Sequence, residues 1–171
     1  MKSISFCPSC ASEGFVNSES KSWRCSDCGF IYFHNTAAAV GGILKVKNEI
    51  LLAIRKHNPG KGMLDLPGGF VDYDESLEAA LVREMQEELR VTLGPWRYVF
   101  SYPNRYEYEG VLYNTIDAFF LTELDEKPNV IASDDVADIV WVDIQEIDLE
   151  RIAFVSVRNA VIHLQGNADA H

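Results

Sequence analysis

Apolar positions that alternate or cluster from residue 36 onward predict a series of β-strands. Thr36–Lys47 and Ile50–Lys56 are mainly apolar and flank the turn residues Asn48 and Glu49, which is the pattern of a hairpin. The other expected strands are Met63–Leu66, Arg97–Tyr102, Tyr113–Leu121 and Ile139–Val142.

Two segments are expected to be helices. The first begins after Ser76, whose hydroxyl makes it a good N-cap, and runs to about Arg90. A loop over residues 67–75 leads into it. The second covers about Phe154–Leu164, with Gly166 as its expected end. Strands combined with two helices indicate an α/β sandwich with a mixed sheet.

Length and composition are those of a globular chain. The 171 residues suffice for one hydrophobic core, and 47% of them are hydrophobic. The chain has no apolar run near the roughly 18 residues of a transmembrane helix. Residues 1–7 lack the apolar stretch of a secretory signal. We therefore expect a cytoplasmic protein with no membrane partner.

The net charge of −11 makes this chain a poor general ligand for nucleic-acid backbones, and no nucleic-acid partner is expected. Seven acidic and two basic residues lie between Asp72 and Arg90. An anionic small molecule would bind there through bridging metal cations. The alternative is a solvated acidic face that keeps the protein soluble.

The cysteines form two Cys-x-x-Cys pairs, Cys7/Cys10 and Cys25/Cys28, separated by 14 residues. This spacing presents four thiolates to one tetrahedral Zn²⁺, with no coordination site left open for catalysis. Disulfides or four unrelated thiols are the alternatives. We expect a structural zinc ribbon over residues 1–34 and a second domain over residues 35–171.

The first helix carries the clearest chemical signal. At about 100° per residue, its apolar residues share one stripe, and two of its glutamates project along the edge of that stripe. The apolar residues are Leu77, Leu81 and Met85, and the acidic residues are Glu84, Glu87 and Glu88. Clustered carboxylates repel one another unless a cation such as Mg²⁺ or Mn²⁺ joins them. The alternative is an exposed acidic helix end.

The residues before this helix strengthen the metal interpretation. Gly68 and Gly69 follow Pro67 and allow the backbone to approach a metal or a phosphate closely. Arg83 is spaced to reach back to Glu75 in a bidentate pair that orients the helix against the loop.

These residues resemble the Nudix box, G-x5-E-x7-R-E-U-x-E-E-x-G-U, in which U is aliphatic. The segment from Gly69 to Val91 matches eight of the nine fixed positions. Arg90 stands in place of the box glycine, which predicts a longer or differently capped helix. The resemblance implies a Nudix-type α/β/α sandwich.

The resemblance also implies a hydrolase that cleaves the pyrophosphate of a nucleoside diphosphate linked to another group, such as an ADP-ribose-like conjugate. Glu75 and Arg83 would form the orienting pair. The Mg²⁺ (or Mn²⁺) ligands would be Glu84, Glu87, Glu88 and the Gly69 carbonyl. The general base would be one of these glutamates, or an acid of a later loop, Asp134 or Asp135; a plain aspartate-rich turn is the alternative for that loop.

Three further residues are candidates for binding a nucleotide-type substrate. Arg55 is placed to touch phosphates, and Tyr102 and Tyr106 belong to an aromatic tract that offers stacking surfaces for a base. Surface charge and a core edge are the respective alternatives.

A four-cysteine ribbon ahead of a Nudix domain is similar to the layout of NADH pyrophosphatases. Their S-Q-P-W-P-F-P stretch is reduced here to Ser101 and Pro103, with Tyr106 in place of the phenylalanine. We therefore expect NADH not to be the single preferred substrate. NADH pyrophosphatase activity, a non-catalytic nucleotide-sensing domain and a zinc-ribbon interaction module remain alternatives, and a homodimer is left open.

Overall fold

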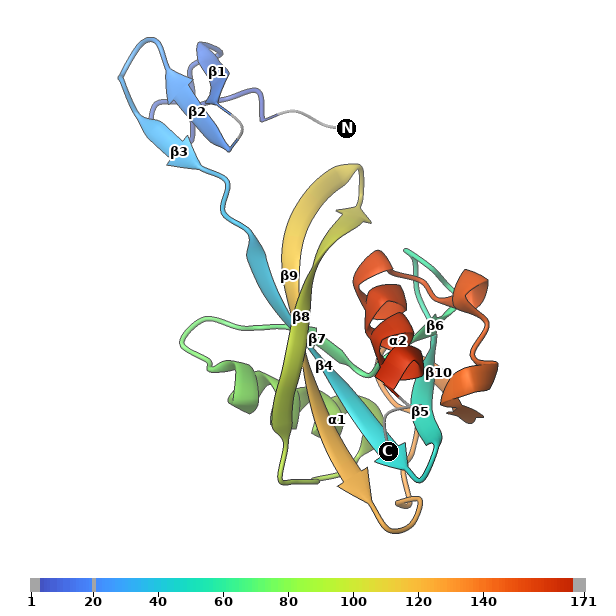
Figure 1. The fold of residues 1–171 in the computed structure, drawn as a ribbon. Coiled ribbons are helices and arrows are strands. Elements are labelled where there is room, and N and C mark those ends of the chain that lie inside the picture. Colours follow the sequence, from blue (N-terminus) through green and yellow to red (C-terminus); the bar gives the residue numbers. More distant parts are fainter. Residues whose placement is uncertain (1–3, 20, 168–171) are drawn as a thin grey trace.

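The computed structural model describes residues 4–19 and 21–167, which fold into two separate sheets (Figure 1). The smaller sheet is antiparallel and has the strand order β1-β2-β3. Its strands are β1 (Phe15–Glu19), β2 (Ser22–Cys25) and β3 (Ile31–Phe33). The proposed domain boundary after residue 34 falls in the connection from β3 to the larger sheet.

The larger sheet has seven strands in the order β10-β5-β4-β9-β8, with β6 paired to β5 and β7 to β4. The pairing of β4 with β9 is parallel and the others are antiparallel, so the expected mixed sheet is confirmed. The strands are β4 (Ala37–Val46), β5 (Glu49–Arg55), β6 (Leu64–Asp65), β7 (Gly68–Phe70), β8 (Arg97–Tyr108), β9 (Val111–Leu124) and β10 (Val136–Asp143).

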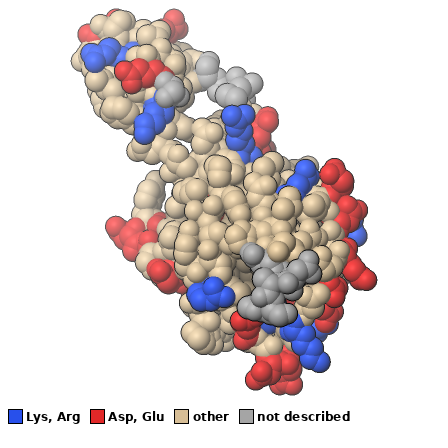
Figure 2. Space-filling view, viewed as in Figure 1, with Lys and Arg blue, Asp and Glu red and all other residues tan. Residues whose placement is uncertain are grey.

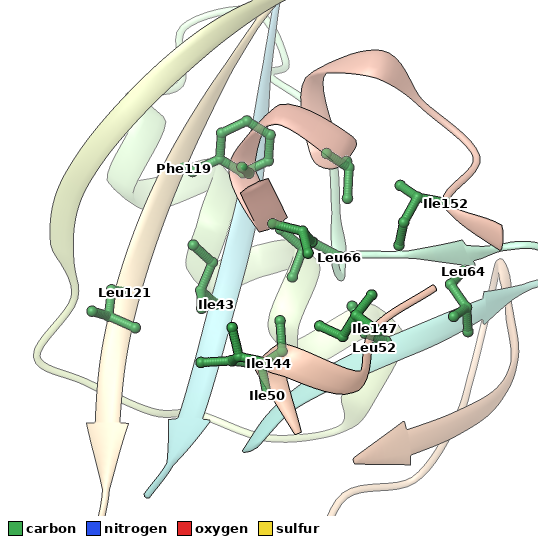
Figure 3. Packing of buried hydrophobic residues seen from close by; sticks show 13 residues of the cluster. Ile43, Ile50, Leu52, Leu64, Leu66, Phe119, Leu121, Ile144, Ile147 and Ile152 are labelled. Carbon is green, nitrogen blue, oxygen red and sulfur yellow. The ribbon is translucent and has the colours of Figure 1, made fainter. Parts of the chain in front are cut away.

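Helices α1 (Leu77–Leu89) and α2 (Val155–Asn167) lie on opposite faces of this sheet (Figure 1). Two short 3₁₀ turns, η1 (Ile144–Glu146) and η2 (Leu149–Arg151), precede α2. Each face has its own apolar core: Leu81, Met85 and Phe120 are buried on the α1 side. The α2 side buries Ile43, Leu52 and Phe119 among others (Figure 3). The α/β/α sandwich is thus confirmed.

Strands β4 and β5 form a much shorter hairpin than the sequence predicts. The two strands pair only at Lys45↔Ile50 and Val46↔Glu49 and then diverge. Beyond the turn, β7 pairs with β4 and β6 pairs with β5. Residues 64–70 therefore insert between the diverging strands, and the expected loop begins with a strand that carries Gly69 into the sheet.

Strands β8 and β9 are longer than expected and form a hairpin arm that ends at Glu109 and Gly110. Both turn residues have positive φ, 51° and 79°, as two-residue hairpin turns of type I′ require. The pattern missed this extension because Glu107, Tyr108 and Tyr113 are exposed, so no apolar periodicity marks the arm.

Gly166 does not end the second helix, which continues to Asn167. Gln165 holds the last turn of the helix. Its side-chain amide donates to the Ile144 backbone carbonyl at 2.9 Å, and its backbone carbonyl accepts from the side-chain amide of Gln145 at 3.1 Å. These bonds offset the roughly 1 kcal/mol by which glycine disfavours a helix.

No helix in the described part of the chain is both long and apolar enough to cross a membrane. On the face seen in Figure 2, the acidic side chains lie toward the margin and the middle is mostly uncharged.

Candidate active site

Helix α1 places its glutamates as the helical spacing predicts. Ser76 caps the helix by accepting from the Ala79 N–H at 3.2 Å. Glu84 and Glu88 are only 9% and 7% exposed beside the apolar stripe, whereas the Glu87 side chain is 46% exposed. Two carboxyl groups are therefore held at the edge of the core, where a solvated acidic face would not place them.

The two glycines of β7 let the backbone touch these carboxylates. The Gly68 N–H donates to Glu88 Oε2 at 2.8 Å. A Cβ at Gly69 would lie 2.4 Å from Glu84 Oε1, so any side chain there would displace the carboxylate. A Cβ at Gly68 would lie 2.1 Å from the Val40 carbonyl oxygen. Glycine is thus required at both positions, because neighbouring atoms leave no room for a Cβ.

Arg83 connects the helix to the preceding loop through every guanidinium nitrogen. Its Nε and Nη2 donate to the two Glu75 oxygens at 3.0 and 2.9 Å, which is the expected bidentate pair. Nη2 also donates to the Phe70 carbonyl, and Nη1 donates to Glu84 at 2.7 Å and to Glu87 at 3.3 Å. These hydrogen bonds lower the pKa of Glu75.

Burial dominates the electrostatics of the other two carboxyl groups. Desolvation raises the pKa of Glu88 to about 9, against the opposing hydrogen bond from Gly68. Desolvation also raises the pKa of Glu84, although Arg83 opposes it. Among the described residues, no lysine or arginine lies within 4.0 Å of the Glu88 carboxylate. A divalent cation would supply the missing positive charge.

The donor chemistry of this cluster suits a hard cation, because all its ligand atoms are oxygens. The glutamate oxygens are not gathered around a common point: within the described ranges, only the four cysteines bring their ligand atoms within 4.8 Å of one another. Arg83 holds Glu84 and Glu87 instead. Binding a cation would therefore require these side chains to turn toward it.

The loop over residues 131–135 is attached to the C-terminal end of α1. The Ile131 and Ser133 N–H groups donate to the carbonyls of Leu89 and Glu88 at 3.0 and 2.8 Å. The loop thereby brings Asp134 and Asp135, both exposed, to the cavity lined by Glu84 and Glu88. The structure places both candidate bases at the site without distinguishing between them.

A cavity of about 330 Å³ opens between α1, this loop and the sheet. Besides the box residues it is lined by Arg55, Asp65, Phe70, Asn104, Tyr106, Thr115, Asp117 and Phe154, among others. Arg55 and Tyr106 were predicted from the sequence, whereas the other residues of this set were not. Asp117 did leave a signal, because it is a charged residue within an apolar strand.

Arg55 is fixed in the wall of this cavity. It donates to Asp65 at 2.7 Å and to the Pro59 carbonyl at 2.7 Å, and its guanidinium lies 4.6 Å from the centre of the Phe154 ring. Burial raises the pKa of Asp65 to about 6, although Arg55 opposes the shift. The guanidinium of Arg55 also interacts with the Tyr106 hydroxyl and opposes the rise that burial causes in the pKa of Tyr106.

The two candidate stacking tyrosines have different positions. Tyr106 lines the cavity and packs against Phe70 and Phe154, with ring centroids 5.4 and 5.7 Å apart. Tyr102 lies outside the cavity lining and is hydrogen-bonded to His163 of α2 at 3.1 Å. Tyr102 is on the same face of β8 as Tyr106 but further along the strand, where it packs against the α2-side core, so we leave it out of the substrate site.

A second, apolar hollow of about 370 Å³ adjoins the cavity and shares Phe70 and Tyr106 with it. Ala37, Tyr108 and Tyr113 complete its lining, so the β8–β9 arm provides most of it. Such a surface suits a flat aromatic ring.

The four cysteines come together in the small sheet. The Sγ atoms of Cys7 and Cys28, and those of Cys10 and Cys25, are each 3.7 Å apart. A tetrahedral Zn–S₄ site with bonds of about 2.3 Å has sulfur–sulfur edges of about 3.8 Å. Backbone N–H groups of Cys28 and Asp27 lower the pKa of the Cys25 thiol to about 6, which favours the thiolate.

An α/β/α sandwich whose central glycine strand and acidic helix carry this box defines a Nudix-type domain. Residues 34–163 match the NUDIX domain family, which is more than half of the 171 residues. The chain belongs to the Nudix family.

Curated relatives include enzymes of two named activities. An ADP-ribose pyrophosphatase of Methanocaldococcus jannaschii is 53% identical over 58 residues, which is 34% of each chain. An NAD-capped RNA hydrolase NudC of Vibrio parahaemolyticus is 28% identical over 102 residues, 60% of this chain and 39% of that protein. The aligned part thus spans less than half the length of these relatives.

Solved structures share the fold. A NUDIX hydrolase from Nitrosomonas europaea superposes with a TM-score of 0.70 at 23% identity, covering 96% of this chain and 92% of that one. The NUDIX domain of Shewanella oneidensis NrtR, complexed with ADP ribose, has a TM-score of 0.63 at 20% identity and covers 81% of this chain and 91% of its own.

Proposed function

We propose that this chain is a divalent-metal-dependent hydrolase that cleaves the pyrophosphate bond of a nucleoside diphosphate linked to a second moiety, with ADP-ribose-like conjugates as substrates. The observation that supports this most is the convergence of Glu84, Glu88 and the glycine strand on one cavity, with Glu88 buried and lacking a cationic partner. The named activity of the archaeal ADP-ribose pyrophosphatase points to the same substrate class.

The carboxylates of Glu84, Glu87 and Glu88 and the Gly69 carbonyl would hold Mg²⁺ or Mn²⁺, which neutralises charge on the diphosphate and activates water. Arg83 orients the carboxylate helix through Glu75. A free carboxylate oxygen of the loop acids or of a box glutamate would accept the proton of the attacking water.

The opposite wall of the cavity would bind the rest of the substrate. Arg55, which lines the cavity, would attract an anionic oxygen of the substrate, whereas Arg83 is engaged by Glu75, Glu84, Glu87 and Phe70. Phe70 and Tyr106 would stack on a planar ring at the border of the two hollows.

A second candidate is an NAD-type dinucleotide. The NudC relatives are named as NAD-capped RNA hydrolases, and the apolar hollow beside the cavity is large enough for a second ring. A comparison of kcat/KM for NADH, ADP-ribose, a diadenosine polyphosphate and a nucleoside triphosphate with Mg²⁺ separates the two candidates. We expect NADH not to lead; a preference for it above ~100-fold, about 2.7 kcal/mol, would replace our first choice by the second.

We also propose that Cys7, Cys10, Cys25 and Cys28 hold one structural Zn²⁺, supported by their sulfur–sulfur distances. Such a site favours a reducing compartment such as the cytoplasm.

The catalytic assignment is tested by turnover of ADP-ribose. Activity should require Mg²⁺ or Mn²⁺, and Glu88→Gln or Glu87→Gln should lower kcat by at least ~100-fold, since each removes an anionic ligand. Glu78→Gln, at an exposed position on the same helix, is the matched control and should retain full activity. Unchanged turnover in Glu88→Gln, or no turnover in the wild type with either metal, would contradict the proposal and favour a nucleotide-sensing domain.

A further inference from the structure

Asn104 is a buried amide with no hydrogen-bond partner among the residues that the structure describes. It lies in β8, is 9% exposed, and lines the cavity. Within residues 4–19 and 21–167, no group forms a hydrogen bond with its side chain. Because the side chain lines the cavity, a polar ligand there would supply the hydrogen-bond partners that it lacks.

Asp117 presents a second polar group beside it. This carboxylate is also 9% exposed and accepts from Thr115 at 2.6 Å and from Ser156 at 2.5 Å. Asp117 lines the cavity, and each of its oxygens can accept a further hydrogen bond. Thr115 is the cross-strand partner of Asn104, so Asn104 and Asp117 are diagonal neighbours on one face of the sheet.

The sheet register sets the distance of this pair from the box. Asp117 pairs with Ala39 of β4, and Ala39 pairs with Phe70 of β7, which follows Gly69. Two interstrand spacings of about 4.8 Å place Asp117 about 10 Å from the strand of the box glycine, and Asn104, on β8, lies one spacing further away. A sugar linked to a diphosphate at the box would reach this point.

We propose that Asn104 and Asp117 bind the vicinal hydroxyls of a ribose in the substrate. One hydroxyl donates to the Asp117 carboxylate and the other accepts from the Asn104 amide, which matches a diol because each hydroxyl both donates and accepts. An acidic side chain is a common partner for ribose hydroxyls. This inference rests on the proposed function and assigns two residues of its substrate site to one ribose.

The test compares ADP-ribose with two analogues, one lacking the 2-hydroxyl of the terminal ribose and one lacking the 2′-hydroxyl of the adenosine. Binding is measured by calorimetry with Ca²⁺ in place of Mg²⁺, and kcat/KM is measured with Mg²⁺. For one of the analogues, which identifies the ribose bound, we expect both affinity and kcat/KM to fall at least about 10-fold. Asn104→Leu should reduce that discrimination to less than about threefold without lowering the melting temperature, because the amide has no protein partner to lose.

Asn114→Leu is the matched control, because Asn114 is exposed on the neighbouring strand and should leave discrimination unchanged. Equal treatment of all three compounds by the wild type, discrimination that survives in Asn104→Leu, or no binding would overturn the ribose site. Turnover without discrimination would leave the hydrolase proposal standing. Discriminating binding without turnover would instead support the ribose site and contradict the hydrolase.

Discussion

Glu88 shows how a single buried carboxyl group couples the stability of this protein to cation binding. Its pKa rises to about 9 because the side chain is desolvated, and the only protein donor recorded at it within the described residues is the Gly68 N–H. Near neutral pH and without a cation, the carboxyl group is therefore protonated. A divalent cation would displace that proton and pull the group into its ionised form.

The raised pKa of Glu88 determines how the free energy of unfolding changes with pH when a chelator removes divalent cations. Between pH 4.5 and about 9 the folded protein keeps a proton on Glu88 that the unfolded chain releases. Stability contributed by this group is therefore present below pH 4.5 and is lost as the pH rises, by about 1.4 kcal/mol per unit. Urea unfolding at pH 5.5, 7 and 8.5 should show a wild-type decline that is weaker in Glu88→Gln.

The comparison between the two proteins isolates Glu88, because the other titrating groups are common to both. Added Mg²⁺ should reduce the wild-type decline and leave the Glu88→Gln protein unaffected. Parallel pH profiles for the two proteins would mean that Glu88 ionises normally in the fold.

Among single residues, the sequence predicts the relative positions of side chains on one helix better than those of side chains on different strands. Glu84 and Glu88 were placed correctly because helical geometry relates them to Leu81 and Met85 over one or two turns. Asn104 and Asp117 come together only through the register of β8 with β9, which local pattern does not determine.

At the scale of elements, the C-terminal end of α1 explains the departure from the box. Of the two expected outcomes, a longer or a differently capped helix, the longer helix is wrong: α1 ends at Leu89, and Arg90 caps it in the left-handed conformation with φ 55° and ψ 34°. That conformation is the one for which the box position favours glycine. Arg90 also donates to Ser133 at 2.7 Å and so adds a side-chain bond to the loop that carries the candidate bases.

Two substitutions separate these effects of Arg90. Arg90→Ala keeps the left-handed strain and loses the bond to Ser133, whereas Arg90→Gly loses the same bond but relieves about 1 kcal/mol of strain. We expect Arg90→Gly to be more stable than Arg90→Ala by about 1 kcal/mol in urea unfolding. Equal stability of the two variants would show that position 90 is not strained in solution.

The wrong predictions about strand pairing, the long β4–β5 hairpin and the missing strand β7, have one physical origin. The turn was expected at Asn48 and Glu49 and lies one residue earlier, at Lys47 and Asn48, because Glu49 already pairs with Val46. The partners of β4 beyond it are β7 and β9, which are close in space and distant in sequence. Turn chemistry is local, while strand pairing is decided by which segments can bury their faces together. The same reason hides β7, a strand of three residues that includes two glycines.

At the scale of the whole molecule, the cysteine-containing sheet stands apart from the larger sheet, near the end of the β8–β9 arm (Figure 1). Its own core is small, built on Cys7, Phe15 and Cys25. The connection is marked by His34, whose ring lies 6.5 Å from that of Tyr113. A core of this size cannot offset chain entropy alone, so the fold of this part should depend on its metal.

Zinc removal should therefore unfold one part and spare the other. The purified protein should contain about one Zn²⁺, as a four-thiolate site implies, and Cys25→Ser should lose it while the control Ser9→Ala retains it. Of the three tryptophans, Trp23 packs in the small core, whereas Trp96 and Trp141 pack on the α1 side of the larger sheet. In NMR spectra of Cys25→Ser, the indole signal of Trp23 should move to its unfolded position while the other two stay in place, because their core contains no cysteine. Zinc retained in Cys25→Ser would contradict the ribbon, and movement of all three signals would mean that the two sheets fold as one unit.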